Sequence, residues 1–277
     1  MKLCVLVFAE EIKVIGQKNL INKLNTYDID SFPHSVILLG EEGSGKHLIC
    51  NYIKDNIVKL PLLDITENIS DEYINMIYRN PNPSIYVIDI EKMTEKEQNI
   101  LLKFIEEPLK TAFIILLCEN RNALLNTVYN RCVVFEMDLY TKEELNEFIT
   151  NDEDRDLILS VLRTPGKILN TNLSNIRAIY DLCDKMIDKI HIANFSNTLT
   201  IKDKINYKDE YNKFDLNVFF DMLIYTLYNK YLNESNKKIL NMYLLTVEAR
   251  KRLIDKRINK EIFVQNFLTK LWKESRI

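Results

Sequence analysis

The residues best suited to chemistry stand together in one short segment, 40–46, which reads Gly-Glu-Glu-Gly-Ser-Gly-Lys. The 277-residue chain has only five glycines, and Gly40, Gly43 and Gly45 fall in this segment. A glycine-rich turn that ends in lysine is typical of a phosphate-binding loop, because its backbone N–H groups can surround a phosphate while the lysine reaches the outer phosphates. The residues assigned to this candidate cofactor-binding loop are Gly40, Gly43, Ser44, Gly45, Lys46 and His47.

The residue after the lysine departs from a complete loop of this kind. A Ser or Thr hydroxyl at that position holds Mg²⁺ in nucleotide-hydrolysing loops, and here the residue is His47. A neutral imidazole suits zinc or copper better than Mg²⁺, which prefers oxygen ligands. Two interpretations stay open: the loop binds nucleotide weakly without Mg²⁺, or it keeps its shape for packing and binds nothing tightly.

A second acidic group is expected where the apolar run 84–89 ends, at Asp89. An acidic residue there would complete the Mg²⁺ shell. Ile90 follows, where a hydrolytic site often carries a glutamate that orients the attacking water. Glu91 comes one residue later and would point to the opposite face of a continuing strand. Asp89 therefore has two interpretations, a weak second residue of the site or a strand-end residue held by local backbone N–H groups.

The elements that position these residues follow from the apolar pattern. Four short runs rich in Ile and Val predict buried parallel strands at 36–39, 84–89, 112–117 and 133–135. The glycine-rich loop follows the first run and precedes a helical stretch, as a phosphate-binding loop requires. Thr94 and Glu97 form a capping box that begins a helix between the second and third runs. This alternation predicts an α/β domain with a parallel sheet and flanking helices.

Three domains are expected. We expect an α/β phosphate-loop domain over residues 1–139, because no strand pattern occurs after residue 139. We expect a small helical lid domain over residues 140–174 and an all-helical domain of amphipathic helices over residues 175–277. Apolar stripes in the last domain belong either to its core or to a surface between subunits; they include Phe219, Leu223 and Leu227.

Composition limits the function further. The net charge of −3 excludes a strongly basic nucleic-acid coat. The basic run 250–252 could contact DNA phosphates, and a solvated helix face with pairs such as Glu248–Arg252 is the alternative. No apolar run approaches the ~18 residues of a membrane span, so no membrane contact is expected. The apolar run 3–9 is expected to be a buried strand and not a signal sequence, because Glu10 and Glu11 follow at once.

The number and spacing of the cysteines indicate the redox state of the protein's compartment. The five cysteines are scattered and form no Cys-x-x-Cys pair, which argues against a disulfide framework and against a cysteine zinc site. We therefore expect no metal ligands in the chain. A reducing cytoplasm is the simplest location.

Several motifs together resemble the delta-prime subunits of bacterial DNA polymerase III clamp loaders, a family of AAA+ proteins. The most specific is the stretch 98–108, Gln-Asn-Ile-Leu-Leu-Lys-Phe-Ile-Glu-Glu-Pro, which follows Met93-Thr94. The shorter matches are Ile15-Gly16-Gln17, the run 33–40, Glu119-Asn120, Asn130-Arg131-Cys132, Pro165-Gly166-Lys167 and residues 258–261. The resemblance covers nearly the whole chain and is diffuse between residues 175 and 250.

The resemblance implies an AAA+ P-loop domain, a helical lid and a helical collar that joins subunits into a ring. In such loaders ATP binding lets the ring open a sliding clamp and grip primed DNA. The arginine of the family's Ser-Arg-Cys motif reaches into a neighbour's ATP site, and Arg131 stands at that position. A surface arginine paired with a carboxylate such as Glu136 is the alternative. The implied partners are the motor subunits, the delta subunit, the sliding clamp and, through the complex, primer–template DNA.

The departures from the family form a pattern. His47, Ile90 and Cys118 replace the Mg²⁺ hydroxyl, the water-orienting glutamate and a polar sensor residue of a hydrolytic site. Arg131, which would serve a neighbour's site, matches. This predicts a non-hydrolysing subunit that requires no cofactor and binds ATP or ADP weakly at most. The four-cysteine zinc module of many family members is absent between residues 54 and 83, so no zinc is expected.

Two other functions remain as alternatives. An active AAA+ ATPase, either a clamp-loader motor subunit or a related remodeller, would need His47 or a neighbour to replace the Mg²⁺ hydroxyl and Glu91 to serve as the catalytic glutamate. A free-standing nucleotide-sensing or DNA-binding module is disfavoured, because the collar-like helices are best explained by ring assembly.

Overall fold

The computed structural model describes residues 15–65, 69–79, 82–109, 111–149, 153–192, 194, 200–206, 214–253 and 258–276. The strand expected at 3–9 lies outside these residues. The chain divides into two compact units, one of Met1–Phe148 with Thr164–Leu169 and one of Ile149–Arg163 with Asn170–Ile277. The three-domain division at residues 139 and 174 stays a prediction.

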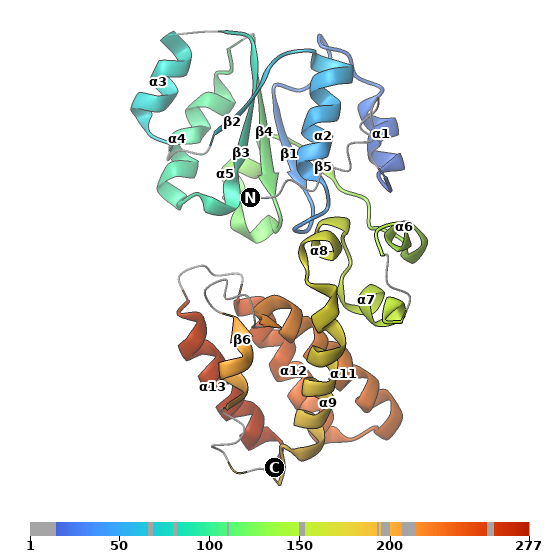
Figure 1. Cartoon of the computed structure of the whole chain (residues 1–277). Coiled ribbons are helices and arrows are strands. Elements are labelled where there is room, and N and C mark those ends of the chain that lie inside the picture. The colour runs from blue at the N-terminus through green and yellow to red at the C-terminus, as the bar shows by residue number, and fades with distance from the viewer. Residues whose placement is uncertain are drawn as a thin grey trace. The chain divides into compact units, whose positions relative to one another are not determined.

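The first unit is built on a five-stranded parallel sheet in the order β2-β3-β4-β1-β5 (Figure 1). Its strands are β1 (Ser35–Leu39), β2 (Leu62–Ile65), β3 (Ser84–Asp89), β4 (Ala112–Cys118) and β5 (Val133–Glu136). The four strands expected from the sequence are confirmed. The edge strand β2 was missed, because it has four residues, half of them exposed, and its Asp64 interrupts the apolar run.

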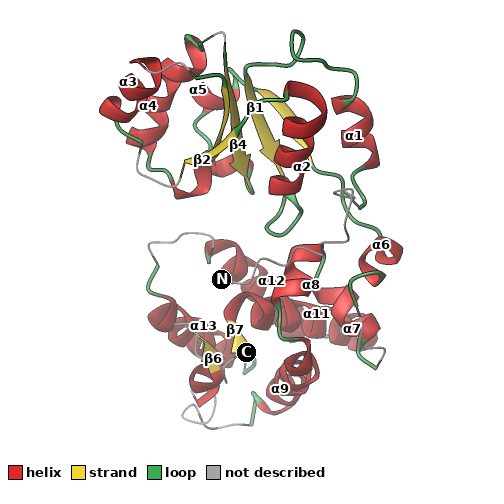
Figure 2. Cartoon of the chain, turned by 45° about the horizontal axis from the view of Figure 1, so that its top comes forward, coloured by secondary structure: helices red, strands yellow, loops and turns green. Residues whose placement is uncertain are grey.

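Helices cover both faces of the sheet (Figure 2). On one face α1 (Lys18–Leu24) and α2 (Lys46–Ile53) pack their apolar residues against β1 and β5. On the other face lie α3 (Asp71–Arg79), α4 (Glu95–Glu106) and α5 (Asn126–Tyr129). The sheet is thus buried on both sides, which explains its continuous Ile and Val runs. A capping box begins α4 as predicted. The helix α6 (Lys142–Asn146) follows β5 and begins with a capping box as well.

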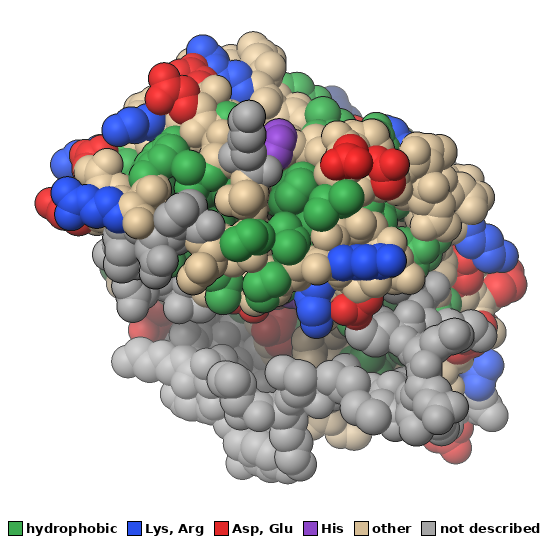
Figure 3. All heavy atoms as spheres, turned by 90° about the horizontal axis from the view of Figure 1, so that it is seen from above, with side chains coloured by type: hydrophobic (Ala, Val, Ile, Leu, Met, Phe, Trp, Pro, Cys, Tyr) green, Lys and Arg blue, Asp and Glu red, His purple; other side chains and the backbone are tan. Residues whose placement is uncertain are grey.

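Seen from the end where the strands begin, this unit gathers hydrophobic side chains on its surface (Figure 3). Four hydrophobic residues that are partly or fully exposed lie shortly before a strand of the sheet: Ile29, Pro61, Pro83 and Leu109. The glycine-rich loop lies at the other end of the sheet, after β1. In open parallel sheets, ligands bind at that carboxyl end of the strands.

The second unit is almost entirely helical. Its main helices are α7 (Arg155–Val161), α9 (Ile176–Lys189), α11 (Leu216–Glu234), α12 (Lys237–Arg252) and α13 (Lys260–Glu274). A short parallel pair, β6 (Ile205–Asn206) with β7 (Phe214–Asp215), is the exception among the described residues. No helix in the described part of the chain is both long and apolar enough to cross a membrane. The parallel sheet with flanking helices and the helical second unit confirm the fold class expected from the sequence.

The core of the second unit shows whether the apolar stripe of α11 is internal or lies on the surface. Phe219, Leu223 and Leu227 of α11 are completely buried, so this stripe is internal core. The basic run 250–252 is held by carboxylates: Arg250 makes a two-pronged contact with Asp221, at 2.8 and 3.2 Å, and Arg252 pairs with Glu248 at 2.6 Å. These pairs favour the solvated helix face over a DNA-binding patch.

Candidate phosphate loop and exposed arginine

The glycine-rich segment forms a tight loop between β1 and α2. Gly43 and Gly45 have φ angles of 76° and 89°, which are in the left-handed region that glycine adopts without steric cost. The loop therefore has the backbone form of a phosphate-binding loop at a helix N-terminus. The Lys46 ammonium bonds the loop's own carbonyl oxygens, at 2.6 Å from Gly40 O and 2.9 Å from Glu41 O.

A phosphate group fits part of this loop. The hydroxyl of Ser44 is buried and makes no hydrogen bond with any residue that the structure describes. A buried hydroxyl without a partner, in a loop that precedes a helix N-terminus, suits an anion with oxygen acceptors. The Mg²⁺ position fits poorly, because the His47 side chain is 68% exposed and its Nδ1 lies 3.9 Å from an Asp64 carboxylate oxygen of β2.

A distant part of the chain braces the loop. The helix α8 (Pro165–Asn170) begins beside it, and Gly166 N–H donates to Gly43 O at 2.9 Å. The Thr164 hydroxyl donates to Glu42 O at 2.8 Å. A Cβ atom added to Gly166 would lie 2.5 Å from the Gly43 Cα, so the two backbones touch and both positions require glycine. We call Thr164, Gly166 and Lys167 with residues 41–43 the loop clasp; Lys167 pairs with Glu41 at 3.3 Å.

Sequence reasoning noticed the Pro165-Gly166-Lys167 turn but not its contact with the loop. The signal that could have found it is the shortage of glycine. Outside the loop only Gly16 and Gly166 occur, so each of these two was a candidate for close backbone packing.

The acidic residues at the ends of β3 and β4 make hydrogen bonds with nearby backbone N–H groups. Asp89 accepts a local hydrogen bond from Glu91 N–H at 3.2 Å, which fits the strand-end interpretation. The Glu91 Oε1 atom accepts from the backbone N–H groups of Glu119 at 2.9 Å and Asn120 at 3.0 Å. The carboxylate of Glu91 thus joins the ends of two strands, and one of its oxygens is already shared between two donors.

Several carboxylates surround the lysine of the loop. Burial lowers the pKa of the Lys46 ammonium below its ordinary value, and the negative charges of Glu119 and Asp89 oppose that shift. Burial raises the pKa of the Glu119 carboxyl, while Lys46 opposes that shift in turn. A bound nucleotide would bring its own negative charge into this acidic surrounding, without a hydroxyl after Lys46 to hold a neutralising Mg²⁺.

Arg131 lies away from the loop, at the start of β5. Its guanidinium pairs with Glu106 at the end of α4, and its Nη1 donates to Thr127 O at 3.0 Å. The structure thus shows the surface ion pair expected as the alternative, with Glu106 and not Glu136 as the carboxylate. The Arg131 side chain remains 42% exposed. An exposed guanidinium with part of its donor set free can reach an anion on another molecule.

The cysteines that the structure describes give no sign of metal or thiolate chemistry. Burial raises the pKa of the Cys50, Cys118 and Cys132 thiols to about 12. These thiols are therefore protonated at neutral pH, and the thiolate is the form that binds metal. Among the described residues, no group of three or more His, Cys, Asp or Glu side chains is arranged to hold a metal ion.

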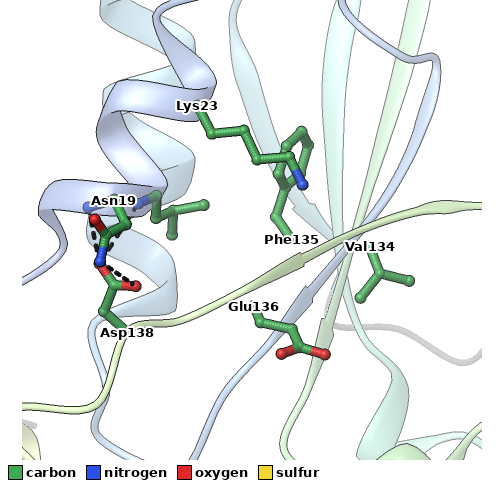
Figure 4. Close-up of a pocket in the computed structure, with 7 residues that line it drawn as sticks. Asn19, Lys23, Val134, Phe135, Glu136 and Asp138 are labelled. Carbon is green, nitrogen blue, oxygen red and sulfur yellow. Dashed lines mark hydrogen bonds between the residues drawn. The ribbon is translucent and has the colours of Figure 1, made fainter.

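The residues of the early Gly-Gln motif have a structural role. The Gln17 carboxamide pairs with the backbone of Asp138 after β5, accepting its N–H at 2.7 Å and donating to its C=O at 3.0 Å. The Asp138 carboxylate accepts from Asn19 N–H at 3.0 Å at the start of α1. A groove of about 360 Å³ lies beside these contacts, and Lys23, Glu136 and Asp138 line it together with Val134 (Figure 4).

Comparisons with known proteins agree with this picture. Residues 63–140 match the family model described as "DNA polymerase III, delta subunit". The DNA polymerase III subunit delta' of Haemophilus influenzae is 26% identical over 110 residues, 39% of this chain and 34% of that protein. The DNA polymerase III subunit gamma of Buchnera aphidicola subsp. Schizaphis graminum is 25% identical over 171 residues, 50% of this chain and 47% of that protein. The chain thus spans less than half the length of these curated relatives.

Among solved structures, a DNA polymerase III gamma subunit-related protein of Thermotoga maritima has a TM-score of 0.42 at 15% identity; the match covers 93% of this chain and 99% of that one. A variant of Thermotoga maritima RuvB has a TM-score of 0.46 at 16% identity, over 76% of this chain and 69% of that one.

The parallel sheet, the phosphate loop after β1 and the helical second unit form an AAA+-type fold. Among proteins with this fold, the chain resembles the delta-prime subunit of DNA polymerase III, and parts of it are similar to curated subunits of the delta-prime and gamma kinds.

Proposed function

We propose that the chain is a delta-prime-like subunit of a DNA polymerase III clamp loader that supports ATP-driven loading of the sliding clamp without hydrolysing ATP itself. The relationship to delta-prime subunits supports the first part. The observation that carries the second is Glu91: its carboxylate binds the backbone N–H groups of Glu119 and Asn120 and so is occupied in the fold. His47 at the Mg²⁺ position supports the same conclusion.

In this proposal Arg131 acts on a neighbouring subunit's ATP. A guanidinium stabilises the negative charge that develops on the phosphoryl group during transfer, and a donor supplied by another subunit makes hydrolysis depend on assembly. The exposure of Arg131 supports this role, since the side chain is accessible to a neighbour.

The partners follow from the same proposal. They are the ATP-hydrolysing motor subunits, the delta subunit and the sliding clamp, with primer–template DNA bound through the whole complex. The location is the cytoplasm, where replication takes place in bacteria. No membrane and no zinc enter the mechanism.

The phosphate loop is proposed to bind ATP or ADP weakly and without Mg²⁺. Lys46 would hold the outer phosphates, and the Ser44 hydroxyl would donate to a phosphate oxygen. Because nucleotide at this loop is not hydrolysed, Lys46→Ala should change clamp loading little. A large loss of loading in that variant would mean that the loop binds a nucleotide the complex needs.

Steady-state ATP turnover tests the arginine role. The purified chain alone should show no turnover, and a mixture with its motor subunits, delta and primed DNA should show turnover that depends on this chain. Arg131→Ala should lower that turnover, with the ~10³–10⁵-fold effect of arginine fingers as the upper scale. Arg131→Lys should restore little, because lysine lacks the guanidinium fork. Arg79→Ala, an exposed arginine at the end of α3, is the control.

Unchanged turnover in an intact complex that contains Arg131→Ala would refute the arginine role. The motor alternative has one observation in its favour, the preserved left-handed glycines and lysine of the loop. Turnover by the chain alone that Lys46→Ala abolishes would establish that alternative.

A further inference from the structure

The guanidinium of Arg131 has two partners within the chain. Its Nε pairs with the Glu106 carboxylate and its Nη1 donates to Thr127 O at 3.0 Å. The Nη2 group makes no hydrogen bond with any residue that the structure describes. Two groups, one at the end of α4 and one in α5, therefore restrain the guanidinium at Nε and Nη1, and Nη2 stays available to a partner.

The position of Glu106 in its helix is unfavourable by itself. Glu106 is the last residue of α4, where the carbonyl end of the helix dipole repels a negative side chain. Glu107 follows and adds a second negative charge. A lysine or arginine at position 106 would stabilise this helix end better than glutamate does. The Glu106 carboxylate therefore contributes through its ion pair with Arg131 and not through the helix.

We propose that Glu106 is a positioning residue, which orients Arg131 for its reach into a neighbour's phosphate site. This inference rests on the proposed function of Arg131. An arginine side chain has many rotamers in solution, and holding its Nε and Nη1 groups selects a few of them, so that Nη2 is presented in a defined position. Pre-orientation lowers the ordering cost when the transition state forms, and so it acts on turnover more than on assembly.

The contact could have the opposite effect, because an intrachain ion pair can also withhold a side chain from its partner. The two effects differ in sign. If Glu106 orients Arg131, its removal lowers turnover by the assembled complex; if Glu106 withholds Arg131, its removal raises turnover. The geometry favours orientation, because the pair is about half exposed and leaves Nη2 free.

The experiment compares Glu106→Ala with Glu107→Ala in the complete complex with motor subunits, delta and primed DNA. Both residues are exposed and adjacent, but only Glu106 contacts Arg131. We expect Glu106→Ala to lower the maximal ATP turnover about tenfold, within the range seen for displaced catalytic groups. The chain concentration for half-maximal stimulation should stay unchanged. Glu106→Gln keeps an oxygen acceptor and should recover part of the loss.

The double variant Glu106→Ala/Arg131→Ala separates positioning from a structural effect. If Glu106 acts through Arg131, the double variant turns over no more slowly than Arg131→Ala alone. Equal turnover of the Glu106→Ala and Glu107→Ala complexes, additive losses in the double variant, or increased turnover with Glu106→Ala would each overturn the inference. The proposed function fails by a different result, unchanged turnover with Arg131→Ala alone.

Discussion

At the ends of β3 and β4, the Glu91 carboxylate replaces water as the partner of two backbone N–H groups, those of Glu119 and Asn120. A carboxylate that accepts hydrogen bonds from two backbone N–H groups is fixed in place. The residue that could serve as a catalytic glutamate therefore has a structural function that does not depend on nucleotide. The thiol of Cys118 also lies 3.6 Å from the same oxygen.

Glu91→Ala should destabilise the chain, because it leaves the N–H groups of Glu119 and Asn120 without their acceptor. The expected loss in the free energy of unfolding is about 1–2 kcal/mol, measured by urea denaturation. Glu91→Gln keeps an acceptor oxygen and should lose less. The opposite pattern, normal stability with lost ATP turnover by the chain itself in Glu91→Gln, would identify Glu91 as catalytic.

The charge of Glu119 should govern nucleotide affinity at the loop. Burial raises the pKa of this carboxyl above its ordinary value of 4.5. The group is neutral below the raised pKa and negative above it, and the negative form repels phosphate. The affinity for ATP without Mg²⁺ should therefore fall as the pH rises through that pKa. Glu119→Gln should bind ATP more tightly at neutral pH and lack this pH step.

Fluorescence titration with a labelled ATP analogue over a pH series measures this effect. Comparison with the unchanged chain at each pH removes the titration of the nucleotide's own phosphates. Glu95→Gln, an exposed carboxylate in the first turn of α4, is the matched control. Equal affinities of the Glu119→Gln variant and the unchanged chain at neutral pH would contradict the argument.

Among the elements, the loop clasp joins the α2 N-terminus to the start of α8. The Gly166 N–H donates a hydrogen bond to Gly43 O, and the Thr164 hydroxyl donates one to Glu42 O. These two carbonyl groups of the loop therefore need no hydrogen bond from solvent. The Tyr140 hydroxyl donates to Ser44 O at 2.8 Å from a third segment. The loop therefore keeps its shape through contacts within the first unit.

Gly166→Ala tests the clasp. The new Cβ would lie 2.5 Å from the Gly43 Cα, and a backbone atom cannot move aside cheaply. We expect a loss in the free energy of unfolding of about 1–3 kcal/mol, the usual cost of overpacking. Gly45→Ala is the comparison, since its Cβ would meet atoms no closer than 3.6 Å and only its φ of 89° is strained. A Gly166→Ala chain as stable as the unchanged one would mean that the clasp is not closely packed.

The elements also mark what the sequence could predict. The sequence predicts the four strands β1, β3, β4 and β5, because an apolar run of three to six residues between turn signals leaves few alternatives. The loop was found because its chemistry lies in consecutive residues. The clasp, the Glu91 contacts and the Glu106–Arg131 pair join residues 25 to 126 positions apart, and neither periodicity nor spacing reports such contacts.

On the scale of the whole molecule, the proposed assembly needs surfaces that the fold leaves uncovered. On α11 and α12, Leu232 and Leu244 are 59% and 55% exposed, whereas Leu227 is completely buried. The rings of Tyr228 and Tyr243 lie 5.9 Å apart and join the same two helices. We call Tyr228, Leu232, Tyr243 and Leu244 the collar surface. Exposed leucines of this kind lower solubility unless a partner covers them.

The collar surface should matter for assembly and not for folding. Leu232→Asp and Leu244→Asp should each change the free energy of unfolding by less than about 0.5 kcal/mol, as exposed substitutions do. Both should weaken association with the motor and delta subunits, measured by analytical ultracentrifugation of the mixture. Leu227→Ala should show the reverse, a loss of about 2–5 kcal/mol in stability with association kept while the chain is folded.

The contrast between these variants distinguishes apolar residues of α11 that form the core from apolar residues of α11 that bind a partner. Leu227 and Leu232 are both leucines of α11, five positions apart, and the sequence alone treats them alike. A complex that forms normally with both aspartate variants would mean that the chain joins its partners through another face, and the collar surface would then lose its role. A chain that unfolds with Leu232→Asp would mean that this position belongs to the core, against its exposure of 59%.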